Sequence, residues 1–258
     1  MPGADTLPLL EVRGVAKRFG SVEALRGVDL RVHAAEVVAL LGDNGAGKST
    51  LIKTISGVHQ PDSGEILVLG KPVAIPSPRA ASALGIETVY QDLALCDNLT
   101  VVQNLFLGRE LHRFSRWPLH WVPARRRMVE RATEVVRQLG TTLPSLHSQI
   151  GTMSGGQRQA IAVARAMVWG SRLVILDEPT AALGVEQTAN VRRVIRNLRA
   201  SGLGVILITH NMQDAFALAD RIVVMRQGRA IAEMDPKVVT PDQVVGAITG
   251  GSAISMEP

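Results

Sequence analysis

Residues 42–49 read Gly-Asp-Asn-Gly-Ala-Gly-Lys-Ser and match the pattern G-x-x-x-x-G-K-[ST] at every defined position. The three glycines, at positions 42, 45 and 47, allow tight backbone turns in which successive N–H groups point at phosphate oxygens. Lys48 offers a positive charge to the terminal phosphates, and the Ser49 hydroxyl can ligate Mg²⁺. The pattern therefore predicts a loop that binds the phosphates of a nucleotide.

The segments on either side of this loop support the same prediction. The apolar run 37–41 predicts a buried strand, and residues 50–55 predict a helix whose N-terminus favours an anion. A flexible glycine turn without a ligand would not require Lys and Ser at the last two positions. The predicted nucleotide contacts in this region are Gly42, Asp43, Asn44, Gly45, Ala46, Gly47, Lys48, Ser49 and Thr50.

Composition predicts an aliphatic α/β protein. Hydrophobic residues make up 46% of the 258 residues and aromatic residues only 3%, which suits parallel strands covered by helices. The net charge of +5 is spread along the chain, which favours a solvated surface over a nucleic-acid or membrane partner. The single cysteine, Cys96, excludes an internal disulfide and fits a reducing cytosol.

Neither a membrane span nor a signal peptide is expected. No apolar run approaches the roughly 18 residues that cross a bilayer, and the N-terminus lacks a basic segment followed by an apolar core. We therefore expect the chain to remain in the cytosol unless a partner holds it at a membrane.

The pattern along the chain predicts one domain over residues 8–250 with a helical subdomain inserted at about 93–168, where no convincing strand occurs. Within that subdomain Pro123 is expected as the first residue of a helix that ends at Gly140. Residues 112–121 alternate tryptophan with positive charge, which fits either a contact surface or a loop folded onto the core. Strands are expected at 9–13, 28–32, 64–73 (two), 86–90, 173–176, 204–208 and 221–234 (a hairpin), and helices at 185–200, 212–219 and from 240.

Two acidic residues end a second apolar strand at Asp177 and Glu178. With this strand beside the phosphate strand, Asp177 would reach Mg²⁺ directly or through water, and Glu178 would face the γ-phosphate and polarise an attacking water. Acidic residues often end strands without such a role, so the complete phosphate loop upstream gives this pair its weight.

A second short motif, Ser154-Gly155-Gly156-Gln157, precedes that strand. A hydroxyl and close-approach N–H groups at a helix start would form another anion site, although a turn followed by a helix cap fits the same residues.

In their order and spacing, these three motifs resemble the nucleotide-binding subunit of an ABC transporter over about residues 8–235. The resemblance implies a P-loop NTPase of the ABC ATPase fold, with a parallel core sheet, an antiparallel β subdomain and an inserted helical subdomain. It also implies that the chain binds and hydrolyses ATP with Mg²⁺.

Further site residues follow from the resemblance alone. It implies that Phe19 stacks on adenine, that Gln91 contacts Mg²⁺ and the attacking water, and that His210 contacts the γ-phosphate. Without the resemblance, Phe19 would be read as a core residue and His210 as a structural hydrogen-bonding residue. The implied catalytic residues are Lys48, Gln91, Glu178 and His210, and the implied metal ligands are Ser49, Gln91 and Asp177.

One departure from the family pattern narrows the resemblance. The family usually has Ser-Ala-Leu-Asp after the acidic pair, whereas this chain has Ala-Ala-Leu-Gly at 181–184, which removes a carboxylate from the usual link across a dimer. The same stretch, with 86–95 and 104–110, is similar to bacterial uptake ATPases of the ribose, xylose and fructose type. The implied cargo is a monosaccharide; a branched-chain amino acid or another solute is the alternative.

The resemblance also implies the partners. Two copies would associate head to tail around two ATP molecules, with residues 154–157 of one copy facing the nucleotide of the other. Separate membrane permease subunits would dock near residues 91–110 at the cytoplasmic face of the membrane, served indirectly by a solute-binding protein. No nucleic-acid partner is expected. DNA-repair relatives are disfavoured because the stretch between Lys48 and Ser154 lacks sustained heptads and cysteine pairs. Ribosome-associated relatives are disfavoured because they normally carry two such domains in one chain.

Overall fold

The computed structural model describes residues 7–112, 123–141 and 143–250. Its main sheet has six strands in the order β10-β9-β3-β8-β7-β6, with β9, β3, β8, β7 and β6 parallel and β10 antiparallel at one edge. Strands β3 and β8 are buried along their whole length, as expected of parallel strands covered on both faces. The bounds are β3 Val37–Leu41, β6 Ile86–Val89, β7 Leu173–Asp177, β8 Gly204–Ile208, β9 Arg221–Arg226 and β10 Arg229–Met234.

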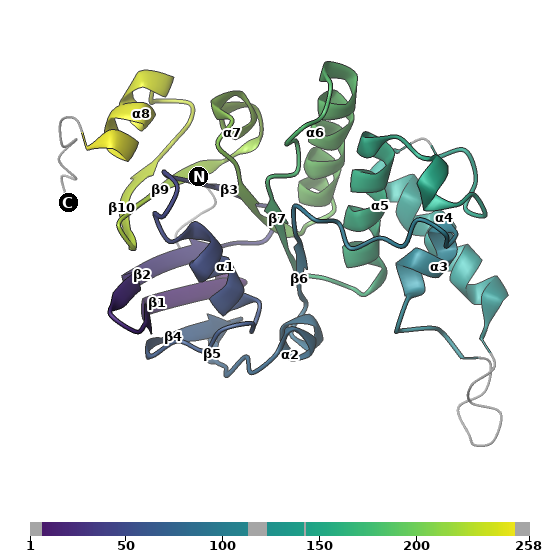
Figure 1. Ribbon diagram of the computed structural model, residues 1–258, viewed down its shortest axis with the longest axis horizontal. Coiled ribbons are helices and arrows are strands. Elements are labelled where there is room, and N and C mark those ends of the chain that lie inside the picture. The colour runs from purple at the N-terminus through teal and green to yellow at the C-terminus, as the bar shows by residue number, and fades with distance from the viewer. Residues whose placement is uncertain (1–6, 113–122, 142, 251–258) are drawn as a thin grey trace.

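A second, antiparallel sheet has the order β2-β1-β4-β5. Helix α1 (Lys48–Ile55) packs into one apolar core with both sheets, which joins Ile52 to Leu10 and Leu40 (Figure 1). The strands expected at 9–13 and 28–32 are confirmed, and both are longer than predicted. The bounds are β1 Leu10–Phe19, β2 Val22–Val32, β4 Ser63–Val68 and β5 Lys71–Pro72.

Helices α3, α4 and α5 pack on one another at one end of the molecule, away from the antiparallel sheet (Figure 1). Their apolar residues share a core with α6 and with the main sheet through Val89, Val174 and Leu176. Between 93 and 168 the described residues contain no named strand, only isolated bridges, and residues 113–122, which hold most of the tryptophan-bearing segment, lie outside the description. The bounds are α2 Pro78–Ala83, α3 Val101–Phe106, α4 Arg125–Leu139, α5 Gly155–Val168, α6 Val185–Ala200, α7 Met212–Leu218 and α8 Pro241–Thr249, with a 3₁₀ turn at Ile150–Thr152.

Two expectations about local structure are wrong. Helix α4 begins at Arg125 rather than Pro123, because the Ala124 N–H donates to the Leu111 carbonyl at 2.6 Å and Ala124 has non-helical backbone angles (φ −84°, ψ 65°). Strand β7 is not beside β3, because β8 lies between them. The crossover through α6 returns the chain to the side of β7 that faces β3.

The helices within residues 7–112, 123–141 and 143–250 are all too short or too polar to span a bilayer.

The fit of the 42–47 loop against β9 can be tested with Gly42→Ala. A Cβ at Gly42 (φ 149°) would lie 2.2 Å from the Met225 carbonyl oxygen, so we expect a stability loss on the order of 1–3 kcal/mol. Gly184→Ala is the control, since its φ is −70° and nothing lies within 4 Å; its change should stay within about 0.5 kcal/mol. Urea unfolding midpoints measure both, and equal midpoints would contradict the close approach of loop and strand.

Candidate functional site

A cleft of about 910 Å³ lies at the carboxyl ends of the parallel strands β3, β7 and β8. The structure brings the predicted phosphate loop into this cleft together with four side chains from elsewhere in the chain: Gln91, Asp177, Glu178 and His210. Its remaining lining comes from Val22, Glu23, Ala24, Ala181 and Ile208. The sequence did not predict that β2 lines the cleft, because no motif indicates how the antiparallel sheet packs against the phosphate loop.

The phosphate loop turns sharply into α1. Helix α1 begins at Lys48, two residues earlier than expected, and its N-cap residue Gly47 has φ 103° and provides no capping side chain. A Cβ at Gly47 would lie 2.7 Å from the Ala24 carbonyl oxygen, so glycine is needed there. No capping side chain therefore occupies the space in front of the N–H groups of the first turn. This cradle formed by the loop and the first turn suits phosphate oxygens.

Lys48 lies over this cradle. Its ammonium group donates to the Gly42 carbonyl at 2.5 Å and to the Asp43 carbonyl at 3.0 Å. Partial burial lowers the pKa of Lys48, while the charges of Glu178, Asp43 and Asp177 act in the opposite direction. The cleft therefore holds a partly desolvated cation at the place where a phosphate would sit.

Asp177 ends β7 and lines the same cleft. Burial, followed by the charge of Glu178, raises the pKa of Asp177, and Lys48 and Lys53 oppose that shift. A carboxylate that is costly to ionise gains from a nearby cation. Ser49 and Gln91 line the same cleft, so hydroxyl, amide and carboxylate oxygens, the donors that Mg²⁺ prefers, surround one space.

Glu178 and His210 form a direct pair across the cleft. The His210 Nδ1 atom lies 2.8 Å from Glu178 Oε2, and the Glu178 N–H donates to the Ile208 carbonyl at 3.0 Å. Glu178 has φ 51°, the left-handed region that non-glycine residues rarely adopt. A carboxylate held by a histidine beside a phosphate cradle can orient and polarise a water molecule.

Two groups of predicted residues lie outside this cleft. Phe19 is 43% exposed, so it is not a core residue; its ring meets His59 edge-on at 5.0 Å, with the Lys17 ammonium 5.7 Å from the ring centroid. Ser154, Gly155, Gly156 and Gln157 open α5, where Ser154 and Gln157 form a reciprocal capping box. Ser154 is exposed, and none of the four lines the cleft around residues 42–50.

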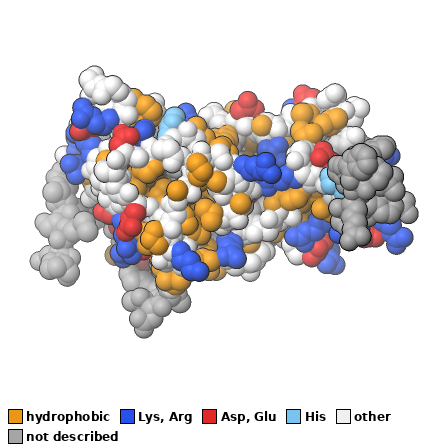
Figure 2. All heavy atoms as spheres, turned by 90° about the horizontal axis from the view of Figure 1, so that it is seen from below, with side chains coloured by type: hydrophobic (Ala, Val, Ile, Leu, Met, Phe, Trp, Pro, Cys, Tyr) orange, Lys and Arg blue, Asp and Glu red, His pale blue; other side chains and the backbone are white. Residues whose placement is uncertain are grey.

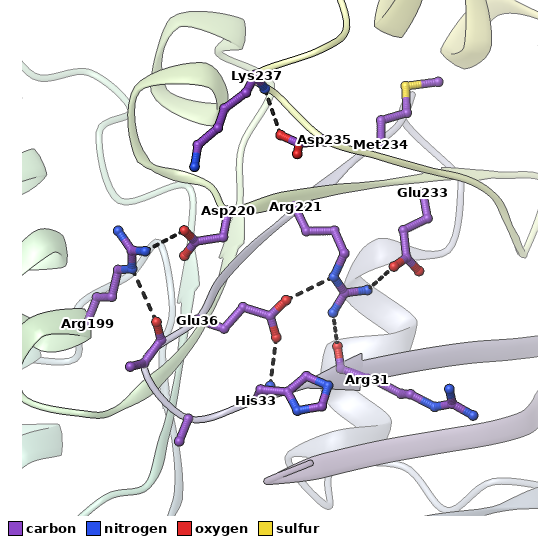
Figure 3. Close-up of a pocket in the computed structure, with 12 residues that line it drawn as sticks. Arg31, His33, Glu36, Arg199, Asp220, Arg221, Glu233, Met234, Asp235 and Lys237 are labelled. Atoms are coloured by element: carbon purple, nitrogen blue, oxygen red, sulfur yellow. Dashed lines mark hydrogen bonds and ion pairs between the residues drawn. The ribbon is translucent and has the colours of Figure 1, made fainter. Parts of the chain in front are cut away.

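A second hollow, of about 710 Å³, lies at the other end of these parallel strands, where β3 and β9 begin (Figure 3). Arg221 pairs there with Glu36 at 2.9 Å and with Glu233 at 2.7 Å, and Arg199 pairs with Asp220 at 2.6 Å. These charges neutralise one another. The loop cleft is the better candidate for a polyanionic ligand, because it holds Lys48 and the uncapped N-terminus of α1.

The charge of Asp177 should destabilise the nucleotide-free protein. Because its pKa is raised in the folded state, the penalty is absent below the ordinary value of 3.8 and complete above the folded value. Asp177→Asn should therefore raise Tm at pH 7 by a few degrees at most, since about 1 kcal/mol shifts Tm by roughly 2–4 °C in a protein of this size. The gain should disappear as the pH falls toward 4.

Circular dichroism melts across that pH range test this expectation. Asp242→Asn, on exposed α8, is the matched control and should give no gain. A lower Tm for Asp177→Asn at pH 7 would show that burial of this carboxylate is not costly.

Comparison with known proteins agrees with this geometry. The sequence pattern of the family described as ABC transporter matches residues 25–181. The chain is 44% identical to the xylose/arabinose import ATP-binding protein XylG of Sulfolobus acidocaldarius, over 93% of this chain and 94% of that protein. It is also 44% identical to the fructose import ATP-binding protein FrcA of Rhizobium meliloti, over 94% of each chain.

Longer relatives and solved structures complete the comparison. A ribose import ATP-binding protein RbsA of Burkholderia pseudomallei is 40% identical over 94% of this chain but only 47% of its own length. The crystal structure of the ADP conformation of MJ1267, an ATP-binding cassette of an ABC transporter, superposes with a TM-score of 0.82 at 28% identity, covering 95% of this chain and 100% of that one. The chain has the ABC ATPase fold, and it belongs to the ABC transporter family.

Proposed function

We propose that this chain is the ATP-binding subunit of an importer that hydrolyses ATP to drive uptake of a monosaccharide. The observation that carries the proposal is the single cleft that joins the phosphate loop to Asp177, Glu178 and His210. Two relatives that match nearly end to end are xylose/arabinose and fructose import ATP-binding proteins, which supports a sugar over other solutes.

ATP would lie with its phosphates over the N-terminus of α1. The loop N–H groups and Lys48 would bind the β- and γ-phosphates, and Thr50 of the first turn lines the same space. The exposed ring of Phe19 would stack on adenine, with a π face adequate for stacking although it lacks a hydroxyl. The proposed phosphate-binding residues are Gly42, Asp43, Asn44, Gly45, Ala46, Gly47, Lys48, Ser49 and Thr50.

The metal proposed for this site is Mg²⁺, held by Ser49, Gln91 and Asp177. When bound, it would neutralise charge on the phosphates. The donor set fits because three oxygen-bearing side chains face one cleft in which the carboxylate of Asp177 is already costly to ionise alone.

In the proposed reaction, Glu178 orients a water molecule whose oxygen forms a bond to the γ-phosphorus as the bond to the bridging β–γ oxygen breaks. The water gives up a proton as ADP and phosphate form, and the Glu178 carboxylate is placed to polarise or accept it. His210 fixes Glu178 and is proposed to reach the γ-phosphate; Gln91 helps to position the water. Lys48 offsets the negative charge of the transferring group.

A second copy of the chain would complete this site. Ser154, Gly155, Gly156 and Gln157 lie outside the cleft, at a helix start whose N-cap Ser154 is exposed, which supports a role toward the nucleotide of a partner. We propose a head-to-tail dimer that ATP closes, since its γ-phosphate would contact both copies, and that hydrolysis reopens.

Separate membrane permease subunits would receive this motion at the cytoplasmic face of the membrane. A hollow of about 570 Å³, which Gly108 and Arg109 line together with Tyr90, supports docking of a cytosolic segment at this end of residues 91–110. A solute-binding protein would act on those subunits and not on this chain.

We treat residues 8–250 as one ATPase domain with a helical subdomain at about 93–168, because α3–α5 share a core with the main sheet.

A nucleic-acid partner is not proposed. On the face shown in Figure 2, Lys and Arg side chains are scattered among apolar and neutral groups and do not form a single stripe. That distribution does not match a groove that follows a phosphate backbone.

The transport proposal is tested by ATP hydrolysis and uptake with the membrane subunits in vesicles. We expect those subunits and a monosaccharide with its binding protein to stimulate hydrolysis and sugar accumulation. Stimulation by DNA or ribosomes instead, or uptake of branched-chain amino acids only, would overturn the proposed function or its cargo respectively.

Glu178→Gln removes the proposed water-orienting carboxylate with little change in shape. We expect hydrolysis to fall by roughly 100-fold or more, with ATP still bound. Glu130→Gln on exposed α4 makes the same chemical change away from the cleft and should keep full activity. Phosphate release and binding of a fluorescent ATP analogue give the two readouts; undiminished hydrolysis would remove Glu178 from the reaction.

Lys48→Ala removes the cation of the phosphate loop. The Kd for ATP should rise at least about tenfold, the equivalent of roughly 1.4 kcal/mol. Lys71→Ala, on exposed β5, is the control and should bind ATP as the wild type does. Unchanged affinity in Lys48→Ala, measured by titration calorimetry, would contradict the assignment of the loop.

A further inference from the structure

A buried carboxylate lies directly behind the candidate site. Asp214, on α7, is 1% exposed, and its carboxylate accepts hydrogen bonds from the Thr180 hydroxyl and from Arg192 Nε, the latter at 2.6 Å. A buried charge is costly unless it is paired and hydrogen-bonded. Arg192, on α6, supplies the compensating charge, so the two bonds to Asp214 form a satisfied network.

This network connects the same two segments that carry the proposed catalytic pair. Thr180 lies two residues after Glu178, and Asp214 lies four residues after His210. Among the described residues, the side-chain bonds of the 178–183 segment are Glu178 with His210 and Thr180 with Asp214. Both bonds connect this segment to residues 210–214. The Glu178–His210 pair faces the cleft, and the Thr180–Asp214 bond is buried behind it.

The backbone of this segment requires support. Glu178 has φ 51° and Ala182 has φ 59°, so two non-glycine residues adopt left-handed backbone within five positions. Such conformations persist only where surrounding contacts hold them. The Ala181 N–H donates to the Glu178 carbonyl at 3.1 Å, and Thr180, between the two strained residues, is tied to Asp214.

The far end of the network is equally well held. Asn211 caps α7, and its side-chain oxygen accepts from the N–H of Gln213 at 2.9 Å and of Asp214 at 3.4 Å. Asn211 directly follows His210, so the first turn of α7 fixes the distance between His210 and the Asp214 carboxylate. A change at either bond to Asp214 would therefore move Glu178 relative to His210.

We propose that Asp214, acting through the Thr180 hydroxyl and charge-balanced by Arg192, is a positioning residue that holds Glu178 against His210. The inference rests on the proposed function, because it assigns Asp214 to the geometry of the hydrolytic pair. Asp214 and Thr180 do not line the cleft, so they act on the site only through the segments that bear Glu178 and His210.

The test compares Thr180→Val with Thr180→Ser in the full chain, using steady-state hydrolysis of ATP with Mg²⁺. Valine keeps the shape of threonine and loses the hydroxyl, whereas serine keeps the hydroxyl. We expect kcat to fall about tenfold or more in Thr180→Val, as loss of positioning predicts, with the KM for ATP and binding of a fluorescent ATP analogue close to wild type. Thr180→Ser should recover most of kcat.

Thr133→Val on α4 is the matched control, since its exposed hydroxyl bonds only the Val129 carbonyl, and it should leave kcat unchanged. Wild-type kcat in Thr180→Val, equal losses in the valine and serine variants, or a parallel loss of ATP binding would each overturn the positioning role. Absence of hydrolysis by the wild type, or full hydrolysis by Glu178→Gln, would instead overturn the proposed function and this inference with it.

Discussion

The parallel pairing of β3, β8 and β7 is the constraint on which the site depends. Ile208, the last residue of β8, pairs with Leu40 on one side and with Asp177 on the other. Because the three strands pair in this register, their carboxyl ends lie side by side. The site groups that follow these strands therefore lie close together although they are far apart in the chain: the phosphate loop, the acidic pair and His210. A slip of one residue would turn the side chains of the slipped strand to the opposite face of the sheet and break the constellation.

Local signals explain why most of this arrangement was predictable. The apolar runs of β3, β7 and β8 and the stop at Gly140 each depend on neighbouring residues alone, and each is confirmed. The glycine-lysine-serine pattern is equally local, and phosphate binding by this loop stays a prediction. The order of the strands depends on partners remote in sequence. The intervention of β8 between β3 and β7, and the wall that β2 contributes at Val22–Ala24, therefore could not be read from the motifs. Pro123 fails for a related reason: the bond from Ala124 to Leu111 joins segments on either side of residues 113–122.

The electrostatics of the cleft favour a ligand that carries both signs of charge. Burial disfavours the charged form of Lys48 and of Asp177 alike, so each lacks part of the solvation that it would have in water. A nucleotide with its metal would bring phosphate to the lysine and a cation to the carboxylate at once. Neither inorganic phosphate nor a metal alone would compensate both charges, so we expect the combined ligand to bind more tightly than either of them alone.

Gly184, which stands where the family pattern usually has an acidic residue, lies at the start of α6. Gly184 occupies the N-cap position of that helix without a side chain to cap it, yet α6 buries Val191, Val194, Ile195 and Leu198 and is tied to α7 by Arg192 and Asp214. The helix thus draws its stability from its packed face and this ion pair, and a capping carboxylate is dispensable for the fold. Nothing lies within 4 Å of a Cβ added at Gly184, so the packing of the described residues neither requires nor opposes a side chain there.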